Sequence, residues 1–149
     1  MILGRHLQLE VFGESHAPII GMRMSGLPEA ANIDLRKLQA FVDRRAPGKD
    51  ALSTSRREPD RVELKRFAGG VVEAVIRNTN VRSGDYETTV PRPGHADWPN
   101  FVKTGRIPPG GGANSGRMTA PMCVAGGICL QQLARRRITV KAKLTACGG

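Results

Sequence analysis

Two strand-like stretches around one short loop open the chain, in residues 6–25, HLQLEVFGESHAPIIGMRMS. Apolar and polar residues alternate through residues 6–12, which is the pattern of a half-buried strand. A second short strand is expected over residues 19–25. Because Gly13 begins the short segment between them, we expect two adjacent antiparallel strands joined by a loop that carries His16.

Four further elements are expected downstream, and they complete an α+β chain that we expect to form a single domain over residues 1–149. They are a helix capped by Asp34 and running to about Arg44, a strand over residues 71–76, a helix from Arg117 to about Arg137, and a strand over residues 138–146. Residues 80–117 show little periodicity and are expected to be irregular. The pair Gly126-Gly127 either weakens the long helix or marks close packing.

The composition combines an ordinary apolar content with a strong positive charge. The chain has 23 Lys and Arg against 13 Asp and Glu, which gives a net charge of +10. Such a balance suits polyanions, phosphorylated small molecules or anionic membranes, and it also fits a generally basic surface. Only 4% of residues are aromatic, which argues against stacking on single-stranded nucleic acid. No apolar run is long enough to span a membrane, and we expect a cytoplasmic protein.

The three cysteines give no sign of a metal site or a disulfide framework. Cys123, Cys129 and Cys147 are odd in number and form no CxxC pair. Two of them, Cys123 and Cys129, lie in an apolar run, so we expect them to be buried reduced thiols. No metal is predicted.

Three groups of residues could carry chemistry. The first is the loop 13–16, where a His after a strand could act as acid, base or phosphate ligand, or simply lie on the surface. The second is a pair of Arg-rich runs, 43–48 and 56–60, whose guanidinium groups suit carboxylate and phosphate or form solvated charge. The third comprises 92–97 and 110–117, where glycines ahead of a helix offer backbone N–H groups to an anion. Together they favour a substrate that carries phosphate and carboxylate.

Six motifs in this order resemble the chorismate synthase family and extend over most of the chain. They are FGESH at 12–16, DRRAPG at 43–48, STSRREPD at 53–60, IRNTNVRSGDY at 76–86, RPGHAD at 92–97 and the triple glycine at 110–112. The resemblance implies an α+β sandwich of antiparallel sheets and helices with an internal duplication. Family members are about twice as long or more, so this chain is expected to be a truncated N-terminal portion that holds about one half of the duplicated fold.

The same resemblance implies a lyase of the shikimate pathway, which leads to the aromatic amino acids. The family removes phosphate from 5-enolpyruvylshikimate 3-phosphate by an anti-1,4-elimination that gives chorismate. It requires reduced FMN although no net redox change occurs, and some members reduce their flavin with NADPH. Family members are homotetramers, so we expect a homo-oligomer that acts on a small molecule, with no membrane or nucleic acid as partner.

The site residues follow from the resemblance motif by motif. It implies catalytic roles for His16, near the leaving phosphate, and for His95, near flavin N1; substrate or NADP binding by Arg44, Arg45, Arg56 and Arg57; and FMN binding by Asn114 and Ser115. Ala17 stands where the family usually has glycine, and a positive φ there would strain the loop. The alternative function is a truncated, catalytically inactive homologue that retains only anion or phospholigand binding.

Overall fold

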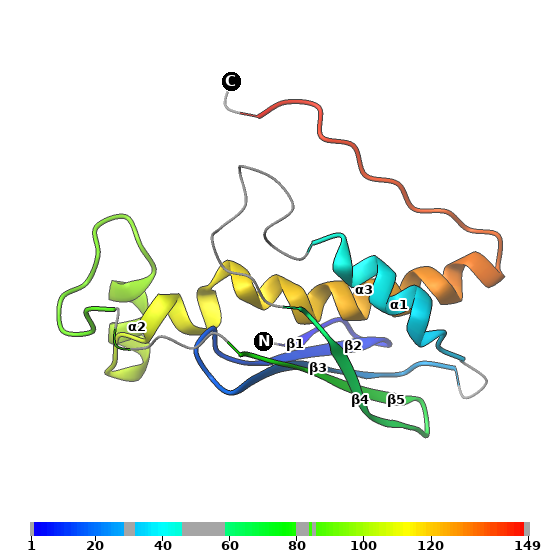
Figure 1. The fold of residues 1–149 in the computed structure, drawn as a ribbon, viewed down its shortest axis with the longest axis horizontal. Helices are drawn as coiled ribbons and strands as arrows, with labels where there is room; N and C mark the ends of the chain where they lie inside the picture. Colours follow the sequence, from blue (N-terminus) through cyan, green and yellow to red (C-terminus); the bar gives the residue numbers. More distant parts are fainter. Residues whose placement is uncertain (1, 29–31, 46–58, 80–83, 85, 148–149) are drawn as a thin grey trace.

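The computed structural model describes residues 2–28, 32–45, 59–79, 84 and 86–147. Its strands are β1 (Ile2–Leu3), β2 (Gln8–Gly13), β3 (Ile19–Ser25), β4 (Val62–Ala68) and β5 (Val71–Arg77). Its helices are α1 (Leu35–Asp43), α2 (Asp97–Thr104) and α3 (Thr119–Arg135), with short 3₁₀ turns η2 (Pro109–Asn114) and η3 (Gly116–Met118) ahead of α3. The fold is α+β: one antiparallel sheet, in the order β1-β2-β3-β5-β4, carries α1 and α3 on one face (Figure 1).

The sheet is amphipathic because its side chains alternate between its two faces. On the face toward the helices, Met22 of β3 lies opposite Val11 of β2 and Ala74 of β5, and all three are buried. On the other face, Arg23 lies between Glu10 and Glu73 on the neighbouring strands. Opposite charges placed across strands stabilise a solvated face, so the core lies between the sheet and the helices.

The long helix α3 fills that core and brings α1 with it. Val124 and Ile128 of α3 pack with the sheet, and Leu38 and Val42 of α1 join the same apolar cluster. The side chain of Asp34 caps α1 by accepting hydrogen bonds from the backbone N–H groups two and three residues later, as the sequence predicted. Among the described residues, none of the helices combines the length and apolar content needed to cross a bilayer.

Most elements expected from periodicity are confirmed. They are the strands β2 and β3 with their antiparallel pairing, the helix α1, the strand β5 and the long helix α3. The glycine pair in α3 divides into two roles. Gly127 faces α1, where a methyl group would lie 2.7 Å from Leu38 Cδ1, whereas a methyl group on Gly126 would meet nothing within 4 Å. The close packing suggested by the sequence is therefore confirmed at Gly127.

The strand predicted over residues 138–146 is wrong for the part of the chain that the structure describes. This segment follows α3 as an extended run, leads away from the sheet (Figure 1), and is assigned no strand. Ile138, Val140 and Leu144 are all exposed. The alternation is present, but a strand forms only where a neighbouring strand supplies the ladder of hydrogen bonds, and none of the described strands lies beside it.

Besides the short β1, two longer elements were not predicted. The first is β4, which forms a hairpin with β5 through Gly69 and Gly70, both at positive φ, as a tight two-residue turn requires. The second is α2, which lies inside the stretch 80–117 that was expected to be irregular. Its stop signal is Gly105, which ends the helix in the left-handed conformation.

The two neighbouring glycines of α3 provide a matched test of the helix packing. We expect Gly127→Ala to lower the free energy of unfolding by about 1–2 kcal/mol, because overpacking against Leu38 outweighs the gain in helix propensity. Gly126→Ala should instead raise it by about 0.5–1 kcal/mol. Urea unfolding of both variants measures the difference. Equal effects at the two positions would contradict the described packing of α1 on α3.

Candidate functional site

Three consecutive glycines form a loop immediately before α3. Gly110, Gly111 and Gly112 all adopt positive φ, at 61°, 86° and 56°. This backbone conformation is open to glycine and costly for other residues. Gly111 and Gly112 are buried, and the loop passes through Ser115 and η3 into α3. The sequence therefore places glycine here because of the backbone path and not as a flexible linker.

Two histidines from distant segments lie against this loop. A methyl group on Gly110 would lie 2.6 Å from Nε2 of His16, and one on Gly111 would lie 3.4 Å from Nε2 of His95. Ser115 lies beside Gly111 as well, at 3.9 Å from the same methyl position. We call residues 110–112 with these two rings the glycine cradle. It brings together three of the residues that the family resemblance implied.

Ser15 fastens the loop that carries His16 to the cradle. The backbone N–H of Ser15 donates to the carbonyl of Gly112 at 3.2 Å. Its hydroxyl lies 3.3 Å from the carbonyl oxygens of Pro109 and Gly110. Because Ser15 is only 1% exposed, these bonds are protected from water. The position of His16 is thus set by the backbone on which it packs.

The His16 loop has two further neighbours. Tyr86 meets the His16 ring edge to face, with ring centroids 4.8 Å apart. Glu14, two residues before His16, forms an ion pair with Arg106. Ala17 follows His16 without strain, because Arg137 is the only residue other than glycine with positive φ in the described part of the chain. The alanine is therefore compatible with the conformation of this loop.

A fully buried carboxylate, Asp60, joins two arginines from distant segments. Arg45 donates from Nη1 to Oδ2 of Asp60 at 2.6 Å, and Arg117 donates from Nη1 to Oδ1. Asp60 is 0% exposed and Arg117 only 7% exposed. Water screens neither charge, so removing one partner would leave the other charge buried and uncompensated.

Asn78 extends this network to the His16 loop. Arg117 donates from Nε to Oδ1 of Asn78 at 3.0 Å. Asn78 in turn donates from Nδ2 to the carbonyl of Ala17 at 2.7 Å and from its backbone N–H to the carbonyl of Pro18 at 3.0 Å. A continuous set of contacts therefore runs from Arg45 to the backbone of the two residues that follow His16.

His95 is held by a second buried carboxylate. Nδ1 of His95 lies 2.8 Å from Oδ1 of Asp97, which is 0% exposed. Arg92 binds the same carboxylate through two side-chain nitrogens, at 2.7 and 2.9 Å, and through its backbone N–H at 3.0 Å. The Arg92 side chain, followed by its backbone N–H and the His95 ring, holds the pKa of Asp97 well below its usual range despite burial.

The other predicted site residues are placed as follows. Arg45 is engaged with Asp60, whereas Arg44 is exposed and lies 5.4 Å above the Phe41 ring. Asn114 donates from Nδ2 to Oδ1 of Asn100 on α2 at 2.8 Å. Ser115 accepts from the backbone N–H of Arg117, which caps η3. Arg56 and Arg57 lie outside the described residues.

Sequence reasoning assigned no role to five residues that build the site: Asp60, Asn78, Tyr86, Asp97 and Arg117. Each lies inside or next to a motif that was quoted for its His, Arg or Gly. The available signal was the mixture of acidic and basic residues in runs such as RREPD and RPGHAD. Partners that lie far apart in sequence cannot be read from such runs.

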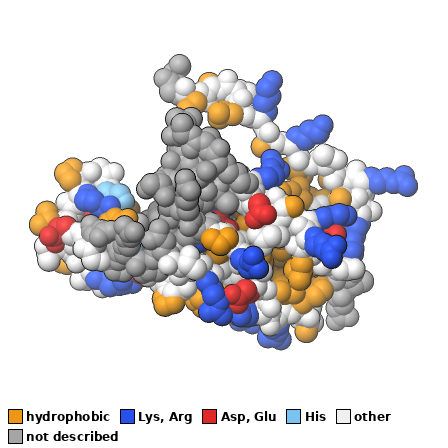
Figure 2. Space-filling view, viewed as in Figure 1, with side chains coloured by type: hydrophobic (Ala, Val, Ile, Leu, Met, Phe, Trp, Pro, Cys, Tyr) orange, Lys and Arg blue, Asp and Glu red, His pale blue; other side chains and the backbone are white. Residues whose placement is uncertain are grey.

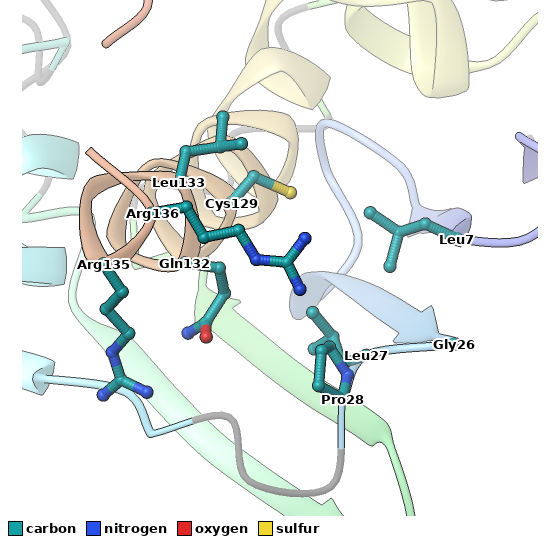
Figure 3. A pocket seen from close by; sticks show the side chains of 9 residues that line it. All are labelled: Leu7, Gly26, Leu27, Pro28, Cys129, Gln132, Leu133, Arg135 and Arg136. Carbon is teal, nitrogen blue, oxygen red and sulfur yellow. The ribbon is translucent and has the colours of Figure 1, made fainter. Parts of the chain in front are cut away.

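A separate pocket of about 460 Å³ lies at the C-terminal end of α3, away from the glycine cradle. Leu7, Leu27 and Leu133 supply apolar lining, and the side chain of Arg136 extends from α3 toward Leu27 (Figure 3). Cys129 also lines it. This thiol was predicted to be buried, but it is half-buried and free, and burial raises its pKa. The described lining residues belong to none of the six motifs.

On the face shown in Figure 2, the positive charge is spread out. Figure 2 shows Lys and Arg side chains scattered across the visible face, not gathered in one patch. Several are paired: Arg77 and Lys65 with Glu63, and Arg106 with Glu14. Part of the positive charge is therefore balanced in ion pairs with neighbouring carboxylates.

Asp60→Asn tests the buried network. We expect it to lower the free energy of unfolding by about 3 kcal/mol or more, because Arg117 is left as an uncompensated buried charge. Glu63→Gln is the matched control, since it also removes one carboxylate with two cationic partners but lies at the surface, where such pairs contribute little. Urea unfolding measures both. A loss at Glu63 equal to that at Asp60 would contradict the role given to burial.

Gly110→Ala tests the contact between His16 and the cradle. Gly105→Ala is the control, because Gly105 has a similar φ of 73° but open space around its methyl position. Both variants should incur backbone strain of about 1–2 kcal/mol. Only Gly110→Ala should also shift the ring resonances of His16 in NMR spectra, because the added methyl group displaces that ring. Unchanged His16 resonances in a folded Gly110→Ala variant would argue against the described approach.

The chain is similar to known proteins in sequence and in fold. The model of the chorismate synthase family matches residues 7–149. A chorismate synthase of Lancefieldella parvula is 41% identical over 93% of this chain and 39% of that protein. One from Halomicrobium mukohataei is 39% identical over 97% of this chain and 37% of that protein. The chain thus spans about two fifths of the length of the curated relatives it matches.

A solved structure described as the crystal structure of chorismate synthase shares the fold. It matches with a TM-score of 0.61 and 23% identity, over 88% of this chain and 35% of that chain. The predicted fold class is confirmed by this likeness and by the antiparallel sheet with its helices. From the family model and the relatives together it follows that this chain belongs to the chorismate synthase family.

Proposed function

We propose that this chain supports the chorismate synthase reaction, the reduced-FMN-dependent anti-1,4-elimination of phosphate from 5-enolpyruvylshikimate 3-phosphate to give chorismate. The observation that carries the proposal is the glycine cradle, where His16 and His95 lie against consecutive glycines of one buried loop. Family membership supplies the reaction class. The cradle supplies two imidazoles at one place for a reaction that releases a phosphate and a proton.

The residues at the cradle fit a flat, anionic cofactor. Because the three glycines carry no side chains, the rings of His16 and His95 can pack directly on this loop, at the methyl positions of Gly110 and Gly111. Ser115 and His95 offer polar groups beside Gly111. Reduced FMN is a planar ring system that carries a phosphate and needs a donor near N1. Its proposed ligands here are His95, Ser115 and Asn114, and the chemistry it would supply is electron density to the allylic system of the substrate.

His16 is proposed as the proton donor to the departing phosphate. Its Nε2 is the nitrogen that lies at Gly110, while its loop is held by Ser15 and Asn78. A leaving phosphate develops negative charge, and a positioned donor lowers the barrier by stabilising that charge as it forms. Because the loop is fastened through buried hydrogen bonds, the ring would not need to be ordered during the reaction.

The arginines are proposed to bind the charged groups of the substrate, with NADPH as a further ligand where the flavin is reduced in place. Arg44 is exposed and available to an anion, whereas Arg45 already donates to Asp60. Guanidinium groups bind carboxylate and phosphate through paired N–H donors. Arg56 and Arg57 complete the proposed set. A homo-oligomer in the cytoplasm remains the assembly that we propose for the chain.

The direct test is phosphate release from 5-enolpyruvylshikimate 3-phosphate by the purified 149-residue chain with FMN under anaerobic reducing conditions. We expect release that depends on reduced flavin, and a fall of roughly a hundredfold or more in His16→Ala, because a positioned acid contributes about that factor. Lys65→Ala is a surface control that should leave the rate unchanged.

Two outcomes would overturn the proposal for this chain. Binding of substrate or inorganic phosphate without flavin-dependent release would identify the chain as an inactive homologue that only binds phospholigands. If the chain binds neither flavin nor substrate, its membership of the family reflects common ancestry and not a shared reaction. Equal release rates in His16→Ala and the unmodified chain would overturn the role of His16 alone.

A further inference from the structure

We propose that Asp97 is a positioning residue for His95: it holds the ring in the tautomer with hydrogen on Nδ1 and thereby leaves Nε2 facing the glycine cradle. This proposal deepens the proposed function, since any use of Nε2 rests on a flavin bound at the cradle. The tautomer itself is a property of the chain alone and can be measured without a ligand.

Two neighbours compete for Nδ1 of His95. Oδ1 of Asp97 lies 2.8 Å away, and Nη2 of Arg92 lies 3.1 Å away. If Arg92 donated to this nitrogen, Nδ1 would carry a lone pair and the ring hydrogen would sit on Nε2. If Asp97 accepts from it, Nδ1 carries the hydrogen and Nε2 has the lone pair. The two arrangements present opposite chemistry to the cradle.

The charges decide between them. An ionised carboxylate can only accept hydrogen bonds, and Arg92 keeps the pKa of Asp97 far below its usual range, so this carboxylate is ionised at neutral pH. A lone pair on Nδ1 would therefore face a negative oxygen at 2.8 Å and be repelled. Arg92 needs no acceptor on the ring, because its Nη2 already donates to Asp97 at 2.9 Å. The hydrogen belongs on Nδ1.

Asp97 is suited to this role because its side chain is held in one orientation. It is 0% exposed and is the first residue of α2, where the helix N-terminus favours negative charge. Both of its oxygens are bonded, Oδ2 to the Nε and backbone N–H of Arg92 and Oδ1 to Nη2. The exposed His95 ring therefore meets a fixed acceptor, which sets its orientation as well as its tautomer.

The consequence concerns the nitrogen that faces the ligand. With Nδ1 bonded to Asp97, the Cε1–Nε2 edge of His95 lies beside Gly111, at 3.2 and 3.4 Å from the methyl position of that residue. Any proton that reaches or leaves the ring does so at Nε2, on the cradle side. His95 thus presents an acceptor when neutral and a donor when protonated, with no change in ring position.

Nitrogen-15 NMR of histidine-labelled protein tests the tautomer directly. The chain has only three histidines, His6, His16 and His95, and a spectrum of His95→Gln assigns the third. The exposed His6 serves as an internal reference. Spectra are taken up a pH series until the ring is neutral. We expect a pyrrole-like shift for Nδ1 of His95 and a pyridine-like shift for its Nε2. The reverse assignment in the unmodified chain would overturn the proposal.

Asp97→Asn and Arg92→Gln separate the two competing neighbours. An asparagine amide can donate to Nδ1, so Asp97→Asn should reduce the Nδ1–H population of His95 by roughly half or more, as happens when a carboxylate no longer fixes an imidazole tautomer. Arg92→Gln keeps the carboxylate and should leave the Nδ1–H tautomer dominant. A tautomer unchanged in Asp97→Asn, or lost equally in Arg92→Gln, would overturn the proposal even if one variant is less stable.

Binding of FMN is measured in a second experiment, apart from the NMR spectra. Titration of the chain with reduced FMN should give a dissociation constant roughly tenfold higher in Asp97→Asn, the loss expected for one misdirected charge-assisted hydrogen bond. A changed tautomer with an unchanged dissociation constant would overturn the functional part of the proposal. If the unmodified chain binds no FMN, the proposed function fails, while the spectra still decide whether Asp97 sets the tautomer.

Discussion

The carboxylate of Asp60 is the constraint on which the rest of this structure depends. A fully buried charge is tolerated only where opposite charges and hydrogen bonds compensate for lost water. Here the compensation comes from Arg45, just after α1, and from Arg117, just before α3. Asn78, at the end of β5, carries the same network to the loop of His16. Arg45 and Arg117 must therefore meet at the two carboxylate oxygens of Asp60, and Asn78 joins them through Arg117.

The glycine cradle and that network hold the same loop, the one that carries His16. Ser15 bonds the His16 loop to the backbone of residues 109–112, and Asn78 holds the same loop after His16 through the carbonyl of Ala17. Glycine loses more conformational freedom on folding than other residues, so three glycines in a row are costly unless the loop is bonded. The backbone and hydroxyl bonds of Ser15 supply that restraint. The result is a bonded glycine loop on which two imidazoles pack.

Local pattern was enough to predict β2, β3, β5, α1 and α3, because their periodicity reflects faces that are buried. The same rule failed at residues 138–146, where alternation is present but no described strand supplies a ladder. It also missed α2, whose Trp98 and Phe101 are exposed and stack on each other. At the site, the histidines were identified from their motifs. Asp60 was not, because its partners lie 15 and 57 residues away, and a solvated RREPD run would look the same.

Helix packing and site electrostatics are coupled through the positions of the two arginines. Arg45 lies two residues beyond the end of α1, and Arg117 lies two residues before the start of α3. The distance between these helices is set where Gly127 admits Leu38 and Phe41. A wider separation would pull Arg45 from Asp60 while Arg117 stayed with α3, and a buried carboxylate with one cation is far less stable than one with two. Gly127 therefore contributes to the arrangement of the cradle, although it touches none of the residues that form it.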